Sequence, residues 1–157
     1  MSGLDAPAHS SEDMCFLDVN VPMYAAGQAH PYRDACAWLM GEVTAGHLVV
    51  AVDTEIIQEI LYRYGALRRI DLAVALATEV LNLIPNVLPI SRDDALLSVD
   101  LFRQYGKGGI TARDVLHAAV MQNHHLQQII TTDTHFETIT GITRLDPLLM
   151  FKQAHAG

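Results

Sequence analysis

The chain has 157 residues and half of them are hydrophobic, so it is long enough for one domain with a sizeable core, and global disorder is excluded. Its formal net charge is −8, from 18 acidic and 10 basic residues. This balance argues against a general nucleic-acid-binding surface, because phosphate groups need a basic patch. It suits a metal site, and a nucleic-acid substrate would require local arginines or a metal ion to offset the charge.

The cysteine usage and the hydropathy pattern indicate a cytoplasmic protein. Cys15 and Cys36 lie on segments that are expected to face the core, so neither a disulfide scaffold nor a zinc site is predicted. No apolar run reaches the roughly 18 residues of a membrane span. The N-terminal residues do not have the charged and then apolar order of a signal peptide. We therefore expect a reducing environment and no membrane partner.

The first third of the chain alternates strand and helix patterns. Residues 1–13 have no periodicity and are expected to form a flexible lead-in. The apolar run Cys15–Leu17 predicts a buried strand. Helices are expected over residues 20–26 and 32–45. The continuous apolar run Leu48–Val52 predicts a second buried strand.

The middle of the chain continues the alternation. Asp53 can cap a helix that keeps its apolar spacing until Gly65, and a further amphipathic helix is expected over Leu67–Leu83. Val87–Ile90 reads as a third strand. The proline at position 89 indicates an edge position in the sheet, because proline cannot donate a hydrogen bond to a neighbouring strand.

The last third repeats the same units and completes a single α/β domain. His124 and His125 are expected at an exposed helix end. Alternating strands and helices predict a parallel sheet covered on both faces, with no second domain. The expected elements are helices over residues 93–105 and 111–123, strands over 128–132 and 142–145, and a tail over 151–157.

Two aspartates directly follow predicted strands. Asp18 follows the first strand and Asp133 the fourth. Open α/β sheets place their ligands beyond the carboxyl ends of the strands, so both carboxylates are expected at that edge. Each also has an ordinary structural interpretation. Aspartate is a good helix N-cap, and the residues Thr134 to Glu137 fit a capping box of their own.

Glu59 is the better candidate of two glutamates in the helix after the second strand. At about 100° per residue, the apolar stripe is centred between Ile57 and Ile60. Glu55 falls nearly opposite this stripe and is expected to be solvated, whereas Glu59 lies closer to its border. Without further context, a surface position is the simpler interpretation of Glu59.

Asp114 shares a helical stripe with Ala118 and Met121, so its carboxylate is expected to be partly buried and to need a partner. The competing interpretation is a capping box from Thr111 to Asp114. Both interpretations can hold together, because an acid in the first turn also suits the helix dipole.

The four acids together predict a metal site. Like charges brought to one sheet edge repel one another and raise each other's pKa values, and a hard cation relieves this repulsion. Mg²⁺, or alternatively Mn²⁺, prefers carboxylate oxygen and retains water ligands. We expect Asp18, Asp114 and Asp133 to hold the metal, directly or through water. Glu59 is expected to hold a metal-bound water or to assist its deprotonation.

Five short stretches, taken in order and spacing, resemble those of PIN domains, and within these the ribonuclease toxins called virulence-associated protein C. They span nearly the whole chain after the lead-in. One departure is His135 before Phe136, where members of the family often have another acid, which weakens any claim of an extra acid there. The stretches are Phe16–Val21, Glu55–Ile60, Thr111–Ala119, Thr131–Phe136 and Arg144–Pro147.

The resemblance implies a fold, a reaction and a site. The fold would be an α/β/α sandwich with a mainly parallel five-stranded sheet over residues 14–150, between the lead-in and the tail. The reaction would be Mg²⁺-dependent endonucleolytic cleavage of RNA, with a 5′-phosphate and a 3′-hydroxyl as products. The acidic site would consist of Asp18, Glu59, Asp114 and Asp133. The resemblance also implies partners: RNA, such as tRNA or another structured RNA, a cognate antitoxin protein, and a second copy in a homodimer.

Several basic and polar side chains are further candidates for RNA contact. Arg63, Arg68 and Arg69 cluster around a helix break beyond Glu59 and could grip phosphates, although a solvated helix face is an equally good interpretation. Arg113 flanks Asp114 and could pair with an acid or touch RNA. Thr132 could hydrogen-bond a metal-bound water.

Other functional classes fit the sequence less well. A haloacid-dehalogenase-like phosphatase also begins with an aspartate at a strand end, but needs a second acid two residues later, where this chain has Asn20. A response-receiver module would need an acid pair before the first strand and a lysine after the last. A non-catalytic PIN-like scaffold that binds RNA or protein remains an alternative, which a metal titration or a nuclease assay would decide.

Overall fold

The computed structural model describes residues 14–156 and contains a five-stranded parallel sheet. The strand order is β3-β2-β1-β4-β5. Every residue of the central strand β1 is buried, as expected for a strand covered on both faces. The strands are β1 (Cys15–Leu17), β2 (Val50–Asp53), β3 (Asn86–Leu88), β4 (Gln128–Ile130) and β5 (Thr143–Leu145).

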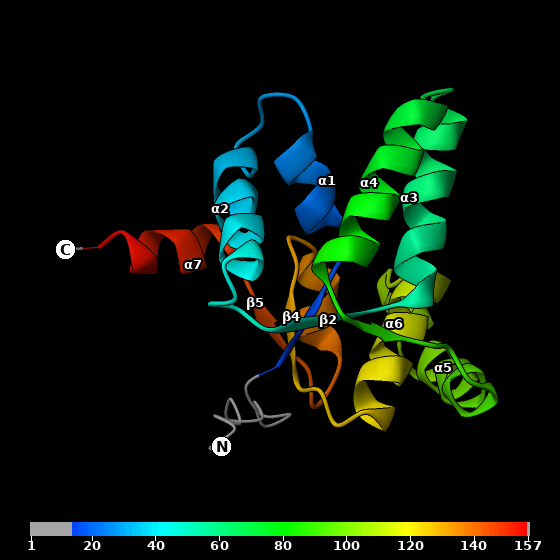
Figure 1. Cartoon of the computed structure of the whole chain (residues 1–157). Coiled ribbons are helices and arrows are strands. Elements are labelled where there is room, and N and C mark those ends of the chain that lie inside the picture. The colour runs from blue at the N-terminus through cyan, green and yellow to red at the C-terminus, as the bar shows by residue number, and fades with distance from the viewer. Residues whose placement is uncertain (1–13, 157) are drawn as a thin grey trace, which may run out of the picture.

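Helices cover both sides of the sheet. α1 packs against α2 and α3 against α4, and the pair α5 and α6 lies on the other side of the sheet in Figure 1. The result is the three-layer α/β/α sandwich that the sequence predicts. The helices are α1 (Asn20–Ala26), α2 (Arg33–Thr44), α3 (Thr54–Ala66), α4 (Ile70–Leu83), α5 (Arg92–Tyr105), α6 (Ala112–Asn123) and α7 (Pro147–Ala154), with short 3-10 turns η1 (Gly106–Gly108) and η2 (Thr134–Thr138).

The order of the strands creates a switch point beside β1. The chain runs from β1 outward through β2 to β3, and then returns to β4 and β5 on the other side of β1. Connections therefore leave β1 and β4 in opposite directions at their carboxyl ends. Such a crevice is where open α/β sheets bind ligands.

Side-chain caps fix the helices that begin near this edge. The Asp53 side chain accepts a hydrogen bond from the backbone N–H of Ile56 and caps α3. Thr111 and Asp114 form a complete capping box at the start of α6, and Ser91 and Asp94 form another at the start of α5. These caps satisfy backbone donors that a helix start leaves unpaired.

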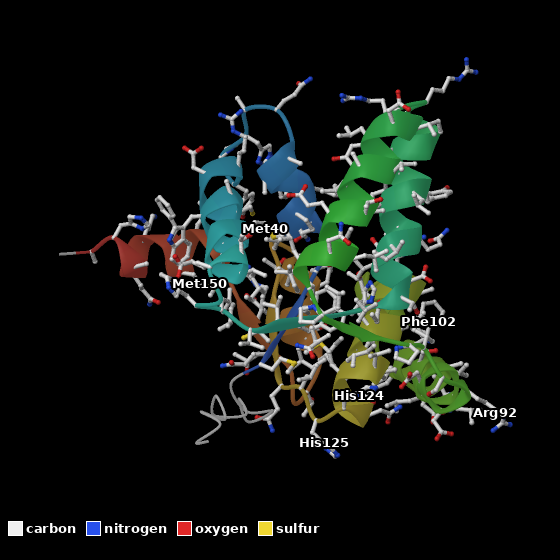
Figure 2. All side chains as sticks on the ribbon, viewed as in Figure 1. Met40, Arg92, Phe102, His124, His125 and Met150 are labelled. Carbon is white, nitrogen blue, oxygen red and sulfur yellow. The ribbon has the colours of Figure 1, made fainter. Side chains whose placement is uncertain are left out.

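Two positions at the molecular periphery agree with the sequence. β3 lies at an edge of the sheet and ends at Leu88, directly before Pro89. His124 and His125 lie exposed at the end of α6, as Figure 2 shows. No helix among residues 14–156 is long and apolar enough to span a membrane.

The structure corrects the expected C-terminal tail. Residues 147–154 form α7, so most of the segment expected as a tail is helical. Asp146 caps this helix, and Pro147 occupies its first turn, where a missing N–H costs nothing. The ring of Phe151 packs edge-on against Trp38 of α2, with the ring centroids 5.8 Å apart. The lead-in expected over residues 1–13 lies outside the described residues.

Candidate active site

Asp18 lies at the carboxyl end of β1, where its carboxylate is almost completely buried. One oxygen, Oδ1, accepts a hydrogen bond from the backbone N–H of Val19 at 2.7 Å. The other, Oδ2, accepts from the Thr131 hydroxyl at 2.7 Å and from the Asn20 amide at 3.2 Å. Burial raises the pKa of Asp18 to about 6, although the charge of His117 and the Thr131 hydrogen bond act in the opposite direction.

Asn20 joins the ends of β1 and β4. Its amide also donates to the Thr131 hydroxyl at 3.1 Å, and its carbonyl oxygen accepts from the backbone N–H of Thr132 at 3.4 Å. The sequence singled out Thr132 as a site residue, but it is the hydroxyl of Thr131 that binds a site acid. The proposed contact of Thr132 with a metal-bound water stays a prediction.

Asp133 follows β4 and caps η2. Its Oδ1 accepts a hydrogen bond from the backbone N–H of His135 at 2.9 Å and lies 2.8 Å from the ring Nδ1 of the same residue. The backbone N–H of Asp133 in turn donates to the Thr131 hydroxyl at 3.0 Å. The Asp133 side chain keeps 29% of its surface exposed, so it combines a capping role with access to solvent and ligands.

Asp114 also has both of the roles that the sequence left open. Its backbone N–H donates to the Thr111 hydroxyl at 3.2 Å, and its Oδ2 accepts from the Thr111 backbone N–H at 3.4 Å. The carboxylate is half-buried and lines the same cleft as Asp133. Burial raises the pKa of Asp114, and the negative charge of Asp133 raises it further, while the bonds to Thr111 lower it.

Glu59 is buried on α3 and is surrounded by cations. Its Oε2 lies 3.5 Å from a guanidinium nitrogen of Arg63 and 3.7 Å from one of Arg113. Arg113 also pairs with Glu55 at 3.3 Å and lies over the ring of Tyr62. The preference for Glu59 over Glu55 as a site residue agrees with this burial, since Glu55 is more exposed.

His117, like Thr131, is a residue of this site that the sequence did not reveal. It lies on α6 without solvent exposure, and its ring nitrogens are 2.7 Å from Asp53 Oδ2 and 2.7 Å from Glu59 Oε1. Burial alone would lower the pKa of His117, but the hydrogen bonds to Asp53 and Glu59 and the charges around them raise it to about 10. The two carboxylates therefore favour the protonated form of the imidazole.

A sequence signal for His117 existed. It lies three residues after Asp114, on a helix turn that also carries Ala118 and Met121, so a histidine on the apolar stripe required buried partners. Those partners, Asp53 and Glu59, are far away in the sequence and only the fold identifies them.

Glu59, Asp114 and Asp133 line one cleft of about 490 Å³. Potential ligand atoms of Asp18, Glu59 and His117 lie within 4.8 Å of one another, and the repulsion of Glu59 and Asp114 contributes to the raised pKa of Asp18. Three of the four acids that the sequence singled out therefore line the cleft, and the fourth, Asp18, lies close to Glu59. Arg68 and Arg69 do not line this cleft. The lining residues are Glu55, Glu59, Arg63, Thr111, Ala112, Arg113, Asp114, Leu116 and Asp133.

The donor set of this cleft fits a hard divalent cation, since the available ligand atoms are carboxylate oxygens. His117 belongs to the same cluster, but both its ring nitrogens are occupied by hydrogen bonds to carboxylates. It therefore contributes positive charge to the site, and the oxygens of the aspartates remain for a metal ion.

Comparison with known proteins agrees with this geometry. The PIN domain family model matches residues 15–142. Ribonuclease VapC13 of Mycobacterium tuberculosis is 33% identical over 132 residues, which are 84% of this chain and 99% of that protein. Ribonuclease VapC23 of the same species is 28% identical over 120 residues, covering 76% of this chain and 93% of that protein.

Solved structures share the fold at low sequence identity. VapBC2 from Rickettsia felis, bound to a DNA fragment from its promoter, has a TM-score of 0.66 and 15% identity, covering 85% of this chain and 98% of that chain. A toxin–antitoxin complex from Klebsiella pneumoniae has a TM-score of 0.60 and 20% identity over 85% and 97% of the two chains. The sarcin–ricin loop cleaving toxin VapC20 of M. tuberculosis has a TM-score of 0.65 and 16% identity over 77% and 90%. By the extent of the family match and its identity to curated relatives, this chain belongs to the PIN domain family and, within it, to the VapC ribonucleases.

Proposed function

We propose that this protein is a Mg²⁺-dependent endoribonuclease that hydrolyses RNA phosphodiester bonds and acts as the toxin of a type II toxin–antitoxin pair. The observation that supports the proposal is a cleft lined by Glu59, Asp114 and Asp133, together with the buried Asp18, whose carboxylate lies within 4.8 Å of that of Glu59. Membership of the VapC ribonucleases supports the reaction class. Mg²⁺ is favoured, with Mn²⁺ as a substitute, because both prefer carboxylate oxygens and retain water.

The four acids have two different parts in the proposed reaction. Asp18, Asp114 and Asp133 hold the metal, which when bound lowers the pKa of a water molecule, orients it and stabilises charge on the phosphoryl group. The Val19 and Thr131 hydrogen bonds fix the direction of the Asp18 carboxylate. Glu59 uses Oε2 to orient the attacking water or to accept its proton, because Oε1 is already bound to His117.

Arg63 and Arg113 are proposed to contact the RNA backbone. They are the basic side chains among the residues that line the cleft, and phosphate contacts of arginine position a nucleic acid without reading its sequence. Without RNA, both guanidinium groups lie near Glu59. This arrangement places positive charge beside the reaction centre of a protein whose net charge is −8. The substrate class that we propose is tRNA or another structured RNA.

Substitution of the metal-binding acids tests the function. Asp18→Asn and Asp114→Asn are each expected to abolish Mg²⁺-dependent cleavage of cellular RNA by the purified protein while leaving the circular dichroism spectrum unchanged. Asp100→Asn is the matched control, because Asp100 is an exposed acid of α5 that pairs with Arg103, away from the cleft. Undiminished cleavage by either site variant would refute the assignment, and sequencing of the cleaved RNA would identify the substrate.

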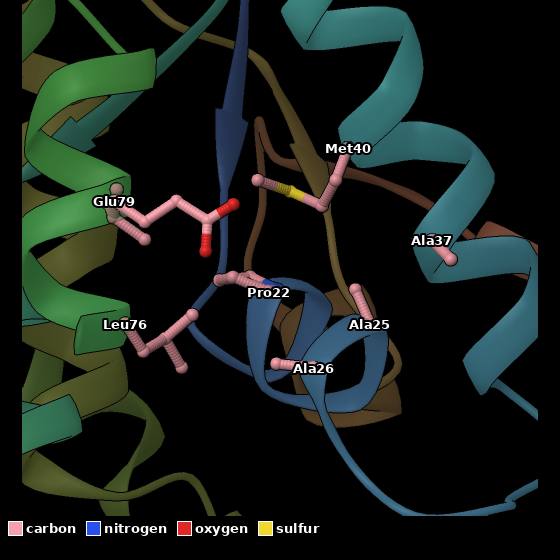
Figure 3. A pocket seen from close by; sticks show the side chains of 8 residues that line it. Pro22, Ala25, Ala26, Ala37, Met40, Leu76 and Glu79 are labelled. Atoms are coloured by element: carbon pink, nitrogen blue, oxygen red, sulfur yellow. The ribbon is translucent and has the colours of Figure 1, made fainter. Parts of the chain in front are cut away.

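We further propose that a cognate antitoxin covers an apolar cavity formed by α1, α2 and α4. The cavity measures about 220 Å³ and opens on a face where Ala25, Met40 and Leu76 meet, with the carboxylate of Glu79 at its side (Figure 3). A hydrophobic pocket with a single acid suits a segment that carries apolar side chains and a basic one. Assembly into a homodimer stays a prediction, which the molar mass in solution would test.

A further inference from the structure

His117 links two buried carboxylates from different parts of the fold. Its ring nitrogen Nδ1 lies 2.7 Å from Asp53 Oδ2, and Nε2 lies 2.7 Å from Glu59 Oε1. Asp53 is without solvent exposure, and Glu59 is 3% exposed. The ring also packs against Phe16 of β1, with centroids 5.4 Å apart. Hydrogen bonds on both edges and packing on its face leave the imidazole one orientation.

The chain of contacts extends to the backbone of the helix that carries Glu59. The second oxygen of Asp53, Oδ1, accepts a hydrogen bond from the Ile56 N–H at 3.2 Å and caps α3. Asp53 is thus held at the end of β2 by its own helix cap, and it holds His117 in turn. The carboxylate of Glu59 is thus held at Oε1 by a histidine that is itself held by Asp53 and Phe16.

Fixing Oε1 determines where the other oxygen of Glu59 lies. Oε2 is the atom that faces Arg63 and Arg113 in the cleft. A glutamate side chain has several rotatable bonds, and a catalytic group must be held in its productive geometry by the contacts of its neighbours. Without the His117 contact, the buried oxygen Oε1 would lose its hydrogen-bond donor and the carboxylate would be free to turn away.

We propose that His117 is a positioning residue: together with Asp53 it forms a buried relay, Asp53–His117–Glu59, that aims the Glu59 carboxylate at the cleft. The inference rests on the proposed function, because Glu59 is the group through which the relay would act. His117 itself touches neither RNA nor metal, since both its ring nitrogens are bound to carboxylates.

Two substitutions of His117 separate the contacts of the relay. The amide of glutamine can occupy the place of the imidazole Nε2, so His117→Gln keeps a donor for Glu59 and loses Asp53. The shorter amide of asparagine corresponds to Nδ1, so His117→Asn keeps a donor for Asp53 and loses Glu59. Both variants place a neutral amide in the same buried space, and each is the control of the other.

The relay predicts a different outcome for the two variants. His117→Asn is expected to lower kcat for RNA cleavage by about 10- to 100-fold, with little change in KM. It should also weaken Mn²⁺ binding, measured by calorimetry without RNA, by about tenfold. Losses of this size are typical when a residue that supports a metal ligand is replaced. His117→Gln should retain both values within about threefold. The proposal would be overturned if both variants lost the same amount of kcat and Mn²⁺ affinity. It would also be overturned if the loss of kcat followed the melting temperature while the Mn²⁺ dissociation constant stayed unchanged.

A variant of Asp53 covers the case in which neither substitution of His117 folds. Asp53→Ser keeps a side-chain cap for α3 but is too short to reach His117. It should lower kcat and Mn²⁺ affinity in the same direction as His117→Asn, and wild-type values in the folded variant would refute the relay. Mn²⁺ affinity is measured without RNA. A wild-type protein that binds Mn²⁺ and cleaves no RNA would therefore count against the proposed function, while the variants would still decide on the relay.

Discussion

Asp18 is the most buried of the three acids that are proposed to hold the metal, and this burial disfavours its ionised form. Burial raises the pKa of Asp18 to about 6, from an ordinary value of 3.8. A folded state that binds a proton more tightly than the unfolded chain is stabilised at low pH. The stability contributed by protonated Asp18 is therefore present below about pH 3.8 and is lost as the pH rises through about 6.

Because the pKa of Asp18 is raised, we predict that Asp18→Asn stabilises the metal-free protein at neutral pH. Removing the buried charge relieves a cost on the order of 1–3 kcal/mol for a shift of this size, and the asparagine NH2 loses a hydrogen bond that Oδ2 accepts, which offsets about 1 kcal/mol. The melting temperature at pH 7.5 should therefore rise by a few degrees. The gain should shrink towards pH 4, where wild-type Asp18 is largely protonated. Thermal unfolding in EDTA at both pH values is the measurement, with Asp100→Asn as the exposed control. An unchanged or lower melting temperature at pH 7.5 would contradict the prediction.

Arg113 is proposed to contact a backbone phosphate of the RNA at the cleft. Its guanidinium contacts Glu55, Gln58 and Glu59, partners that an RNA phosphate would displace. Arg113→Gln is expected to raise KM for RNA by about tenfold and to reduce the slope of affinity against salt by about one. Titration of KM between low and high salt measures both effects. Arg103→Gln removes an exposed arginine of α5 and should change neither. Equal effects of the two substitutions would exclude a specific role of Arg113.

The site residues differ in whether the neighbouring sequence indicates their role. Asp18 and Asp133 were predictable because each directly follows a buried strand, and Glu59 because its helical phase differs from that of Glu55. The role of His117 was not predictable, because its hydrogen-bond partners Asp53 and Glu59 lie on another helix and strand end. A single sequence shows the hydrophobic periodicity of each helix or strand, but it does not show which helices and strands contact one another in the fold.

The elements around the cleft are positioned by their caps, and two matched capping boxes allow this to be tested. Thr111 with Asp114 starts α6 at the cleft, and Ser91 with Asp94 starts α5, where Asp94 binds Asn123. Thr111→Ala and Ser91→Ala should each lower the free energy of unfolding by about 1 kcal/mol. Thr111→Ala should also lower kcat by about tenfold, because the turn that carries Asp114 loosens. Denaturant unfolding and cleavage rates of both variants provide the comparison, and equal kcat values would refute the link between cap and site.

At the scale of elements, the sequence predicted which segments are helices or strands better than it predicted where each one begins and ends. The run Leu48–Val52 predicted a strand, but β2 begins at Val50 and includes Asp53, because pairing with β1 and β3 determines its limits. The helix α7 was missed, although Asp146 and Pro147 form a start signal. Its apolar side chains become informative only when Phe151 meets Trp38 of α2.

At the scale of the whole molecule, the catalytic cleft and the apolar cavity have different characters. The cleft contains acids and arginines at the carboxyl edge of the sheet, whereas the cavity between α1, α2 and α4 is lined mainly by alanine, methionine and leucine. Exposed apolar side chains of α4, such as Ile70 and Val74, extend the hydrophobic surface of that helix.

If the antitoxin covers the cavity, blocking the cavity should separate inhibition from catalysis. Ala37 lines the cavity from α2, and Ala37→Arg would fill it with a charged side chain without touching any proposed catalytic group. We expect a cognate antitoxin to bind the variant about tenfold more weakly or worse, a loss of about 1.4 kcal/mol, since the new side chain would occupy the space that the apolar groups of the antitoxin need. RNA cleavage by the free variant should remain at the wild-type rate.

Ala75→Arg is the matched control, because Ala75 is exposed on α4 and does not line the cavity. Calorimetry of the complexes is the measurement, and equal affinities of the two variants would place the antitoxin on a different face.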